Sequence, residues 1–199
     1  MYKRLISSLI PSLITTALLI PFAAQADWTL DGQASSLGFV SIKNGAVVES
    51  HQFKRLSGII SAEGEARLII DLDSVETLIP IRNERMRSLL FKTTEYSEAF
   101  VSIDLDMNEF VTLDIDSNMA KTLTVDVMIS GQTAAVTAPV NITRSGDSIM
   151  VSSIKPLVIS AGSWGLMPGI EALRAIAGLT SITPAVPVSF SLKFDLQAD

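Results

Sequence analysis

The sequence has no cysteine and one histidine, and each scarcity excludes classes of function. Without cysteine, the 199-residue chain forms no disulfide, thiolate zinc site, iron–sulfur cluster or nucleophilic thiol. The single histidine, His51, leaves little for metal binding or general-base chemistry, and we assign it no role. The chain also lacks a Gly-x-Ser-x-Gly motif, a phosphate loop and a dinucleotide fingerprint. These absences predict that the protein is not an enzyme and holds no metal.

Basic residues are few as well. Fifteen Lys and Arg oppose 21 Asp and Glu, and the formal charge is −6. A chain of this charge offers no broad basic surface to a phosphate backbone, so we expect no nucleic-acid partner. Hydrophobic residues make up 48% of the chain and charged residues 18%, which excludes intrinsic disorder.

The first 26 residues have the features of a secretory signal peptide. Lys3 and Arg4 precede an apolar run over residues 5–23, and the small residues Ala24 and Ala26 occupy the −3 and −1 positions before Asp27. The alternative is an uncleaved membrane anchor, but the run contains two prolines and ends in small residues. We expect cleavage after Ala26, export to the periplasm and no stable membrane insertion afterwards. The mature chain of 173 residues then has 13 basic and 21 acidic residues, for a formal charge of −8.

Apolar and polar residues alternate with a period of two along most of the mature chain, as in half-buried strands. The clearest example is 101–107, which we pair in a hairpin with 111–115 through a turn near Asn108 and Glu109. Turn residues also occur at 130–132 and 145–147. About eight strands fit the pattern, drawn from 28–30, 37–42, 46–61, 67–73, 101–107, 111–115, 123–129, 136–142 and 188–196.

Two segments show helical spacing instead, at 81–92 and 169–177. No linker or charge block divides the chain, so we predict one domain over residues 27–199. Alternation alone also fits an outer-membrane barrel with its apolar face toward lipid. Aromatic residues are only 6% of the chain, too few for aromatic girdles, and several aspartates share the polar face. We therefore predict an all-β, antiparallel barrel with an apolar interior and one or two short helices.

Several short motifs follow one another in a distinctive order. The central stretch is Ser74-Val75-Glu76-Thr77, then Arg82-Asn83-Glu84-Arg85-Met86-Arg87-Ser88, Phe91 and Glu95-Tyr96. The flanking motifs are Trp28-Thr29-Leu30-Asp31, the stretch from Phe53 to Gly58, and Ser163-Trp164-Gly165-Leu166. In this order the motifs resemble the YceI-like family. The chain departs from the family pattern where Asn83 replaces Asp, Arg85 replaces His, Leu90 replaces Asp and Ser97 replaces Pro.

The resemblance implies a periplasmic, lipocalin-like, extended barrel whose apolar pore holds a polyisoprenoid such as a prenyl quinone or prenyl phosphate. On this hypothesis the protein carries or sequesters the lipid without chemistry, and the lipid is its only bound group. One alternative is a packed barrel without ligand that serves in protein interaction or stress response. An enzyme acting on a prenyl lipid ranks last. A homodimer is compatible with the sequence.

Inward-facing positions of the predicted strands are the candidate pore residues, and the alternative for each is an ordinary core position. A cluster of arginines in the predicted helix is the candidate site for a polar head group, because Arg suits phosphate. Its alternative is a solvated helix face that pairs with acids such as Glu84. The pore candidates are Phe39, Leu68, Ile70, Val101, Ile103, Leu105, Leu113, Leu123, Val125, Val127, Val140, Phe190, Leu192 and Phe194, and the head-group candidates are Arg82, Arg85 and Arg87.

Overall fold

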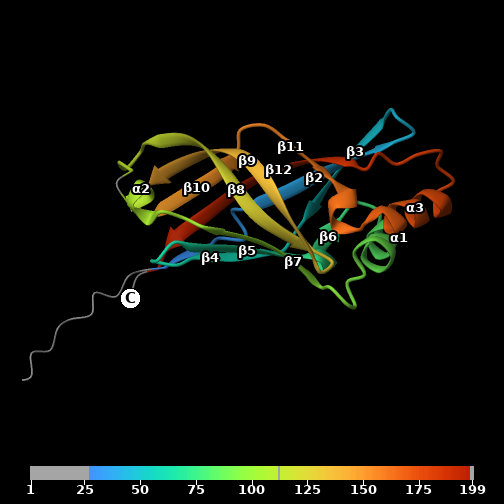
Figure 1. Ribbon diagram of the computed structural model, residues 1–199, viewed down its shortest axis with the longest axis horizontal. Helices are drawn as coiled ribbons and strands as arrows, with labels where there is room; N and C mark the ends of the chain where they lie inside the picture. Colours follow the sequence, from blue (N-terminus) through green and yellow to red (C-terminus); the bar gives the residue numbers. More distant parts are fainter. Residues whose placement is uncertain (1–26, 112, 198–199) are drawn as a thin grey trace, which may run out of the picture.

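Eight antiparallel strands close into an elongated barrel in the computed structural model, which describes residues 27–111 and 113–197 (Figure 1). Pairing between β1 and β12 completes the ring, so the predicted antiparallel barrel is confirmed. The predicted signal peptide, 1–26, lies outside the described residues. In ring order the strands are β1 (Trp28–Leu30), β4 (Leu56–Ile60), β5 (Glu65–Asp71), β7 (Glu98–Asp104), β8 (Asn118–Ile129), β9 (Gln132–Ser145), β10 (Ser148–Ser153) and β12 (Ala185–Leu196).

The β8–β9 hairpin shows how the alternating sequence produces this wall. Exposed and half-buried residues alternate along all of β8, because successive side chains point to opposite faces of a strand. Ser130 and Gly131 connect the strands with φ values of 50° and 74°. Two left-handed residues match the right-handed twist of a hairpin, which is why the predicted turn forms at this place.

Four further strands extend one end of the barrel beyond the ring: β2 (Ser36–Lys43), β3 (Val47–Phe53), β6 (Val75–Glu76) and β11 (Leu157–Ser160). Both β2 and β11 pair with β12, whereas β6 pairs only with β3 within the described chain. Helices instead cover this end, on the right in Figure 1. We call it the helical end, and its covering segments are α1 (Pro80–Arg85), the π-helix η2 (Met86–Phe91), the 3-10 helix η3 (Ala161–Trp164) and α3 (Met167–Ile176).

The opposite end is closed by strand pairing and by α2 (Met107–Val111), and the predicted strand at 111–115 is wrong. The backbone N–H of Asn108 donates to Oδ1 of Asp106 at 3.1 Å, a side-chain contact typical of a turn that starts a helix. Phe110 of α2 is buried in the core. β7 therefore pairs with the far part of β8, joining residues 100–102 to 126–128.

Other predicted elements need smaller corrections. The stretch 46–61 is two strands, β3 and β4, separated by Lys54 and Arg55, and β10 and β11 were not predicted. The helix predicted at 81–92 is present as α1 followed by η2, and the helix predicted at 169–177 is α3. The 3-10 helix η1 (Leu72–Ser74) joins β5 to β6. Within the described ranges, no helix has the length and apolar character needed to cross a bilayer.

Candidate ligand-binding cavity

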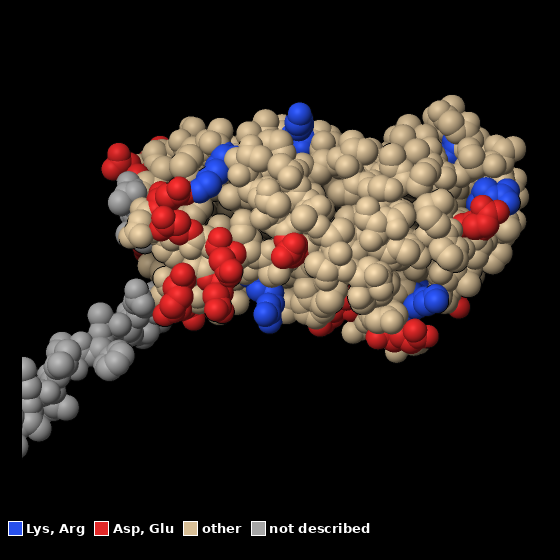
Figure 2. Space-filling view, in the orientation of Figure 1, with Lys and Arg blue, Asp and Glu red and all other residues tan. Residues whose placement is uncertain are grey.

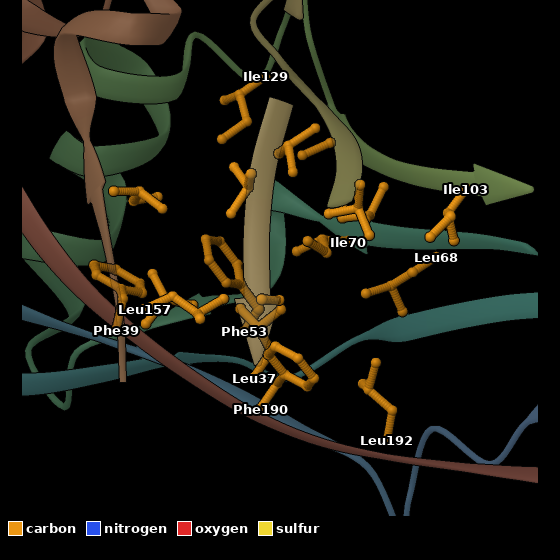
Figure 3. A pocket seen from close by; sticks show the side chains of 18 of the residues that line it. Leu37, Phe39, Phe53, Leu68, Ile70, Ile103, Ile129, Leu157, Phe190 and Leu192 are labelled. Atoms are coloured by element: carbon orange, nitrogen blue, oxygen red, sulfur yellow. The ribbon is translucent and has the colours of Figure 1, made fainter. Parts of the chain in front are cut away.

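The barrel encloses an apolar cavity of about 280 Å³. Figure 3 shows side chains from several strands converging on it, and Arg67 is the one charged residue in its wall. Five alternate residues of β12, from Val186 to Phe194, line the cavity. Eight residue steps along a strand span about 27 Å, so the cavity is long and narrow.

Thirteen of the fourteen pore candidates from the sequence line the cavity, and they make up 13 of its 34 wall residues. Leu113 is the exception among the pore candidates: it is half-buried against the core after α2 and is not in the cavity wall. Whether the wall residues contact a ligand stays a prediction. The candidates that line the cavity are Phe39, Leu68, Ile70, Val101, Ile103, Leu105, Leu123, Val125, Val127, Val140, Phe190, Leu192 and Phe194.

The cover at the helical end also contributes to the wall, and sequence reasoning missed it. An apolar residue at helical spacing shows that one face is buried, but it does not show which end of a barrel that face covers. β11 was missed as well, although the alternation at Leu157 and Ile159 indicates a strand. The cover residues in the wall are Leu90, Phe91, Ala161, Trp164, Leu166 and Ile170.

Two contacts hold the cover in place. A Cβ on Gly169 of α3 would lie 2.6 Å from the carbonyl oxygen of Leu89 and 2.7 Å from Cα of Leu90, so only glycine lets α3 approach η2 this closely. The Nε1–H of Trp164, which is buried, donates to the carbonyl oxygen of Val127 at 2.8 Å. This bond ties η3 to β8 and satisfies the buried indole.

A polar cluster lies at the same end of the barrel, where β2, β3 and α1 meet. Arg82 Nη1 is 2.7 Å from Oε2 of Glu49, and Lys43 pairs with the same carboxylate. Hydrogen bonding from Lys43, and then from Arg82, lowers the pKa of Glu49 to about 2. Arg82 also donates through Nη2 to the carbonyl oxygen of Thr77 at 2.5 Å.

The three candidate head-group arginines do not converge on one point in this arrangement. Arg82 belongs to the polar cluster, and Nη1 of Arg87 donates to the carbonyl oxygen of Asp73 at 3.3 Å. Arg85 is half-buried, and its side chain has no hydrogen-bond or ion-pair partner in the described part of the chain. A head-group role for these residues stays a prediction.

His51 completes the polar cluster and is 5% exposed. Its Nε2 lies 2.8 Å from Oγ of Ser41, and its ring packs against Phe39 of the cavity wall at a centroid distance of 5.1 Å. Burial, and then the charge of Arg82, lowers the pKa of His51 to about 4. A serine and a histidine at this distance have the spacing of a nucleophile and its base. However, a base with this pKa is weak, and Nδ1 has no partner to orient the ring.

No arrangement suited to a metal is found over residues 27–111 and 113–197, where no three His, Asp or Glu side chains form a group that could hold an ion. The cavity and its apolar wall are therefore the feature of the described chain that best fits a ligand. Its shape fits a slender apolar molecule.

Comparison with known proteins gives one family and several similar structures. The family model of the YceI-like domain matches residues 28–194. A polyisoprenoid binding domain from Saccharophagus degradans, implicated in plant cell wall breakdown, is 40% identical, with a TM-score of 0.83 over 85% of this chain and 98% of that domain. No curated protein matches the chain significantly.

More distant structures share the fold alone. BcnA of Burkholderia cenocepacia is 20% identical, with a TM-score of 0.64 over 82% of this chain and 98% of that protein. A YceI protein of Campylobacter jejuni is 15% identical, with a TM-score of 0.50 over 75% of this chain and 85% of that protein.

Proposed function

The chain belongs to the YceI-like family, and we propose that it is an exported, non-catalytic protein that holds a polyisoprenoid chain inside its barrel. The long apolar cavity is the observation that carries this proposal. A prenyl tail has no polar group along its length, so a wall of aliphatic and aromatic side chains leaves no polar atom of the ligand unpaired. Burial contributes about 0.8 kcal/mol per CH₂, which is ample for a tail of several prenyl units.

The dimensions of the cavity favour a tail over a bulky ligand. A volume of about 280 Å³ lies just under the range of about 300–1,000 Å³ that is typical of small-molecule sites. Spread along β12, this volume suits a single extended chain. The polar end of the lipid then belongs at an opening of the barrel, and the polar cluster places charged and neutral groups at the helical end. Similarity to the polyisoprenoid binding domain of S. degradans supports the same class of ligand.

Two other functions fit these observations less well. A packed barrel used only for protein interaction needs no internal cavity. An enzyme needs a base that works near neutral pH, and His51, with a pKa of about 4, does not supply one. Export to the periplasm is part of the proposal and is supported by the basic and apolar pattern of residues 1–26.

Mass spectrometry of lipid extracts tests the proposal. Protein purified from a periplasm is extracted beside two variants of β9, Ala138→Phe and Ala135→Phe. Ala138 is buried in the cavity wall, whereas Ala135, three positions away, is exposed. We expect a stoichiometric prenyl lipid in wild type and Ala135→Phe, and its loss in Ala138→Phe, because a phenyl ring fills part of the cavity.

Two results would contradict the proposal. Equal lipid in Ala138→Phe and Ala135→Phe would place the ligand outside the cavity. An empty wild-type extract, still empty after incubation with prenyl quinones and prenyl phosphates, would remove the lipid-binding function and favour the packed-barrel alternative.

A further inference from the structure

An exposed apolar turn precedes α1 at the helical end. Leu78 is 84% exposed, and Ile79 and Ile81 are 43% and 51% exposed. Single exposed apolar residues are ordinary on protein surfaces. Three large aliphatic side chains within four positions form a patch, and such patches mark interaction sites. We call residues 78–81 the Leu78 turn.

The backbone of Leu78 adds a second anomaly. Its φ is 64°, in the left-handed region that Gly and Asn adopt readily and a leucine rarely does. Because the side chain of Leu78 is mostly exposed, its packing does not offset the strain of this backbone conformation. Strain of this kind persists where the surrounding structure enforces it, and it clusters at functional sites.

A hydrogen-bonded frame holds the turn in this conformation. The N–H of Leu78 donates to Oε1 of Glu76 at 2.6 Å, and Nδ2 of Asn83 donates to the same oxygen at 3.0 Å. The N–H and Oγ1 of Thr77 both donate to Oδ1 of Asn83, at 2.9 Å and 2.5 Å. Arg82 bonds the carbonyl oxygen of Thr77 at 2.5 Å and ties the frame to Glu49 of β3. The apolar side chains are therefore presented on a rigid support.

Charge distinguishes this end from the other. Acidic side chains gather around α2 and its neighbouring turns, at the left of Figure 2, whereas the right end of that view shows charged side chains of both signs. We call the end with α2 the acidic end. Arg85 follows Ile81 by one helical turn, and its charge has no partner within the described residues. The acidic residues in α2 and in the turns and strand ends of the acidic end are Glu63, Glu65, Asp104, Asp106, Glu109, Asp114, Asp116 and Asp147.

We propose that the Leu78 turn docks the barrel on a phospholipid bilayer with anionic lipids, with Leu78, Ile79 and Ile81 inserted at the interface. Apolar side chains beside a free arginine are the combination that binds such surfaces. The acidic end lies tens of ångströms away along the barrel, beyond the Debye length of about 8 Å at physiological salt, so its charge does not oppose docking. The inference rests on the proposed function, because a barrel that carries a membrane lipid must exchange it with a bilayer.

Continuity with the cavity supports this orientation. α1 runs directly into η2, and Leu90 and Phe91 of η2 line the cavity. A bilayer in contact with the Leu78 turn therefore lies next to the helical cover. The prenyl tail can pass between bilayer and barrel at this cover without crossing the closed ring of strands.

Vesicle binding by Leu78→Asn tests the docking surface. Asparagine tolerates the left-handed backbone, so the variant removes the apolar side chain without adding strain. The matched control is Ile115→Asn, because Ile115 is 61% exposed and follows α2 at the acidic end. Cosedimentation uses vesicles of phosphatidylethanolamine and phosphatidylglycerol, and thermal unfolding is measured in parallel. We expect roughly tenfold weaker binding for Leu78→Asn, with Tm unchanged or raised, and wild-type binding for Ile115→Asn.

The outcomes separate docking from lipid binding. Equal vesicle binding by wild type and Leu78→Asn, or no binding by either, would overturn the docking proposal. A second copy of the chain is the alternative occupant of this surface. The docking proposal would be overturned in its favour if wild type binds no vesicles and is a dimer in sedimentation velocity, whereas Leu78→Asn is a monomer. Lipid extracts of the same preparations test the proposed function independently. A wild type that binds vesicles but never contains prenyl lipid would contradict only that function.

Discussion

The two ends of the barrel are closed by different interactions. At the acidic end, β1 pairs with β12 and β4 to complete the wall, and α2 packs Phe110 into the core. At the helical end, side-chain packing of η2, η3 and α3 covers the cavity. A cover held by side-chain packing can open locally at a lower free energy than a ring of paired strands. If the barrel holds a lipid as proposed, we expect the lipid to enter at the helical end.

Charge follows the same division. Carboxylates at the acidic end mostly face solvent, where like charges cost little. At the helical end, Lys43, Glu49 and Arg82 form a partly buried cluster beside His51. A partly buried charge loses hydration, so it is stable only while its partner carries the opposite charge. We therefore expect the stability of the helical end to be the more sensitive to substitution and to pH.

The largest effect is expected from Trp164→Ala at the helical cover. Removal of a buried aromatic side chain costs about 3–5 kcal/mol of unfolding free energy, and here a hydrogen bond to Val127 is lost as well. Hydrogen exchange then quickens in η3, α3 and η2 more than in β1 and β12. Urea unfolding gives the free energy, and exchange mass spectrometry gives the location.

Phe110→Ala is the matched variant at the acidic end. Phe110 is buried in α2, so the loss of stability is of similar size. We expect its faster exchange to be confined to α2 and its surroundings. If the two variants speed exchange in the same segments, the two ends are one cooperative unit and the comparison fails.

The alternation of residues made the barrel wall predictable, because inward positions in a strand are a local property of the sequence. The means of closure were not predictable from the same pattern. β1 meets β12 across most of the chain, and Gly169 reveals its role only when η2 lies against it. The segment 111–115 alternates like a strand, but the turn at Asp106 and the burial of Phe110 favour a helix, α2, over a hairpin.

The candidate site shows the same limit. The three arginines are close in sequence, which favoured a shared role in binding a head group. Arg82 instead pairs with Glu49, a residue of a different strand, and Arg87 bonds a backbone carbonyl. His51 received no role from sequence because a single histidine is more often structural than catalytic. Its neighbours, Ser41 and Phe39, reach it only through the pairing of β2 with β3.

A smaller effect is expected from acid at the helical end. The pKa of His51 is about 4 in the folded protein and about 6.5 when exposed, so the unfolded chain binds more protons between these values. Stability therefore falls as pH drops from 6.5 to 4, by at most about 3 kcal/mol. The charges facing this histidine are Lys43, Glu49 and Arg82.

His51→Gln removes this dependence and tests it. We expect the variant to lose less stability than wild type between pH 7 and pH 4.5 in urea titrations. The pKa of Glu49 is about 2 in the folded protein and 4.5 as its ordinary value, so its contribution to stability is lost only as pH falls from 4.5 towards 2. This loss affects wild type and His51→Gln alike. Parallel pH profiles for wild type and His51→Gln would show that the histidine does not make this end acid-sensitive.

The smallest effect belongs to the acidic end. Asp104→Asn together with Asp114→Asn should change the unfolding free energy by no more than about 0.5 kcal/mol, because both carboxylates are exposed. Any change should be a gain in unfolding free energy, because the substitutions relieve repulsion between carboxylates, and 0.5 M NaCl should abolish the gain by screening.

Glu49→Gln at the helical end should cost more, about 1.5–3 kcal/mol of unfolding free energy, because it leaves Lys43 and Arg82 without their shared carboxylate. Urea unfolding at low and high salt separates these cases. Equal losses of unfolding free energy from the two sets of variants would mean that the charges at both ends contribute alike to stability. The polar cluster would then not be favoured over the acidic end as the site of a lipid head group.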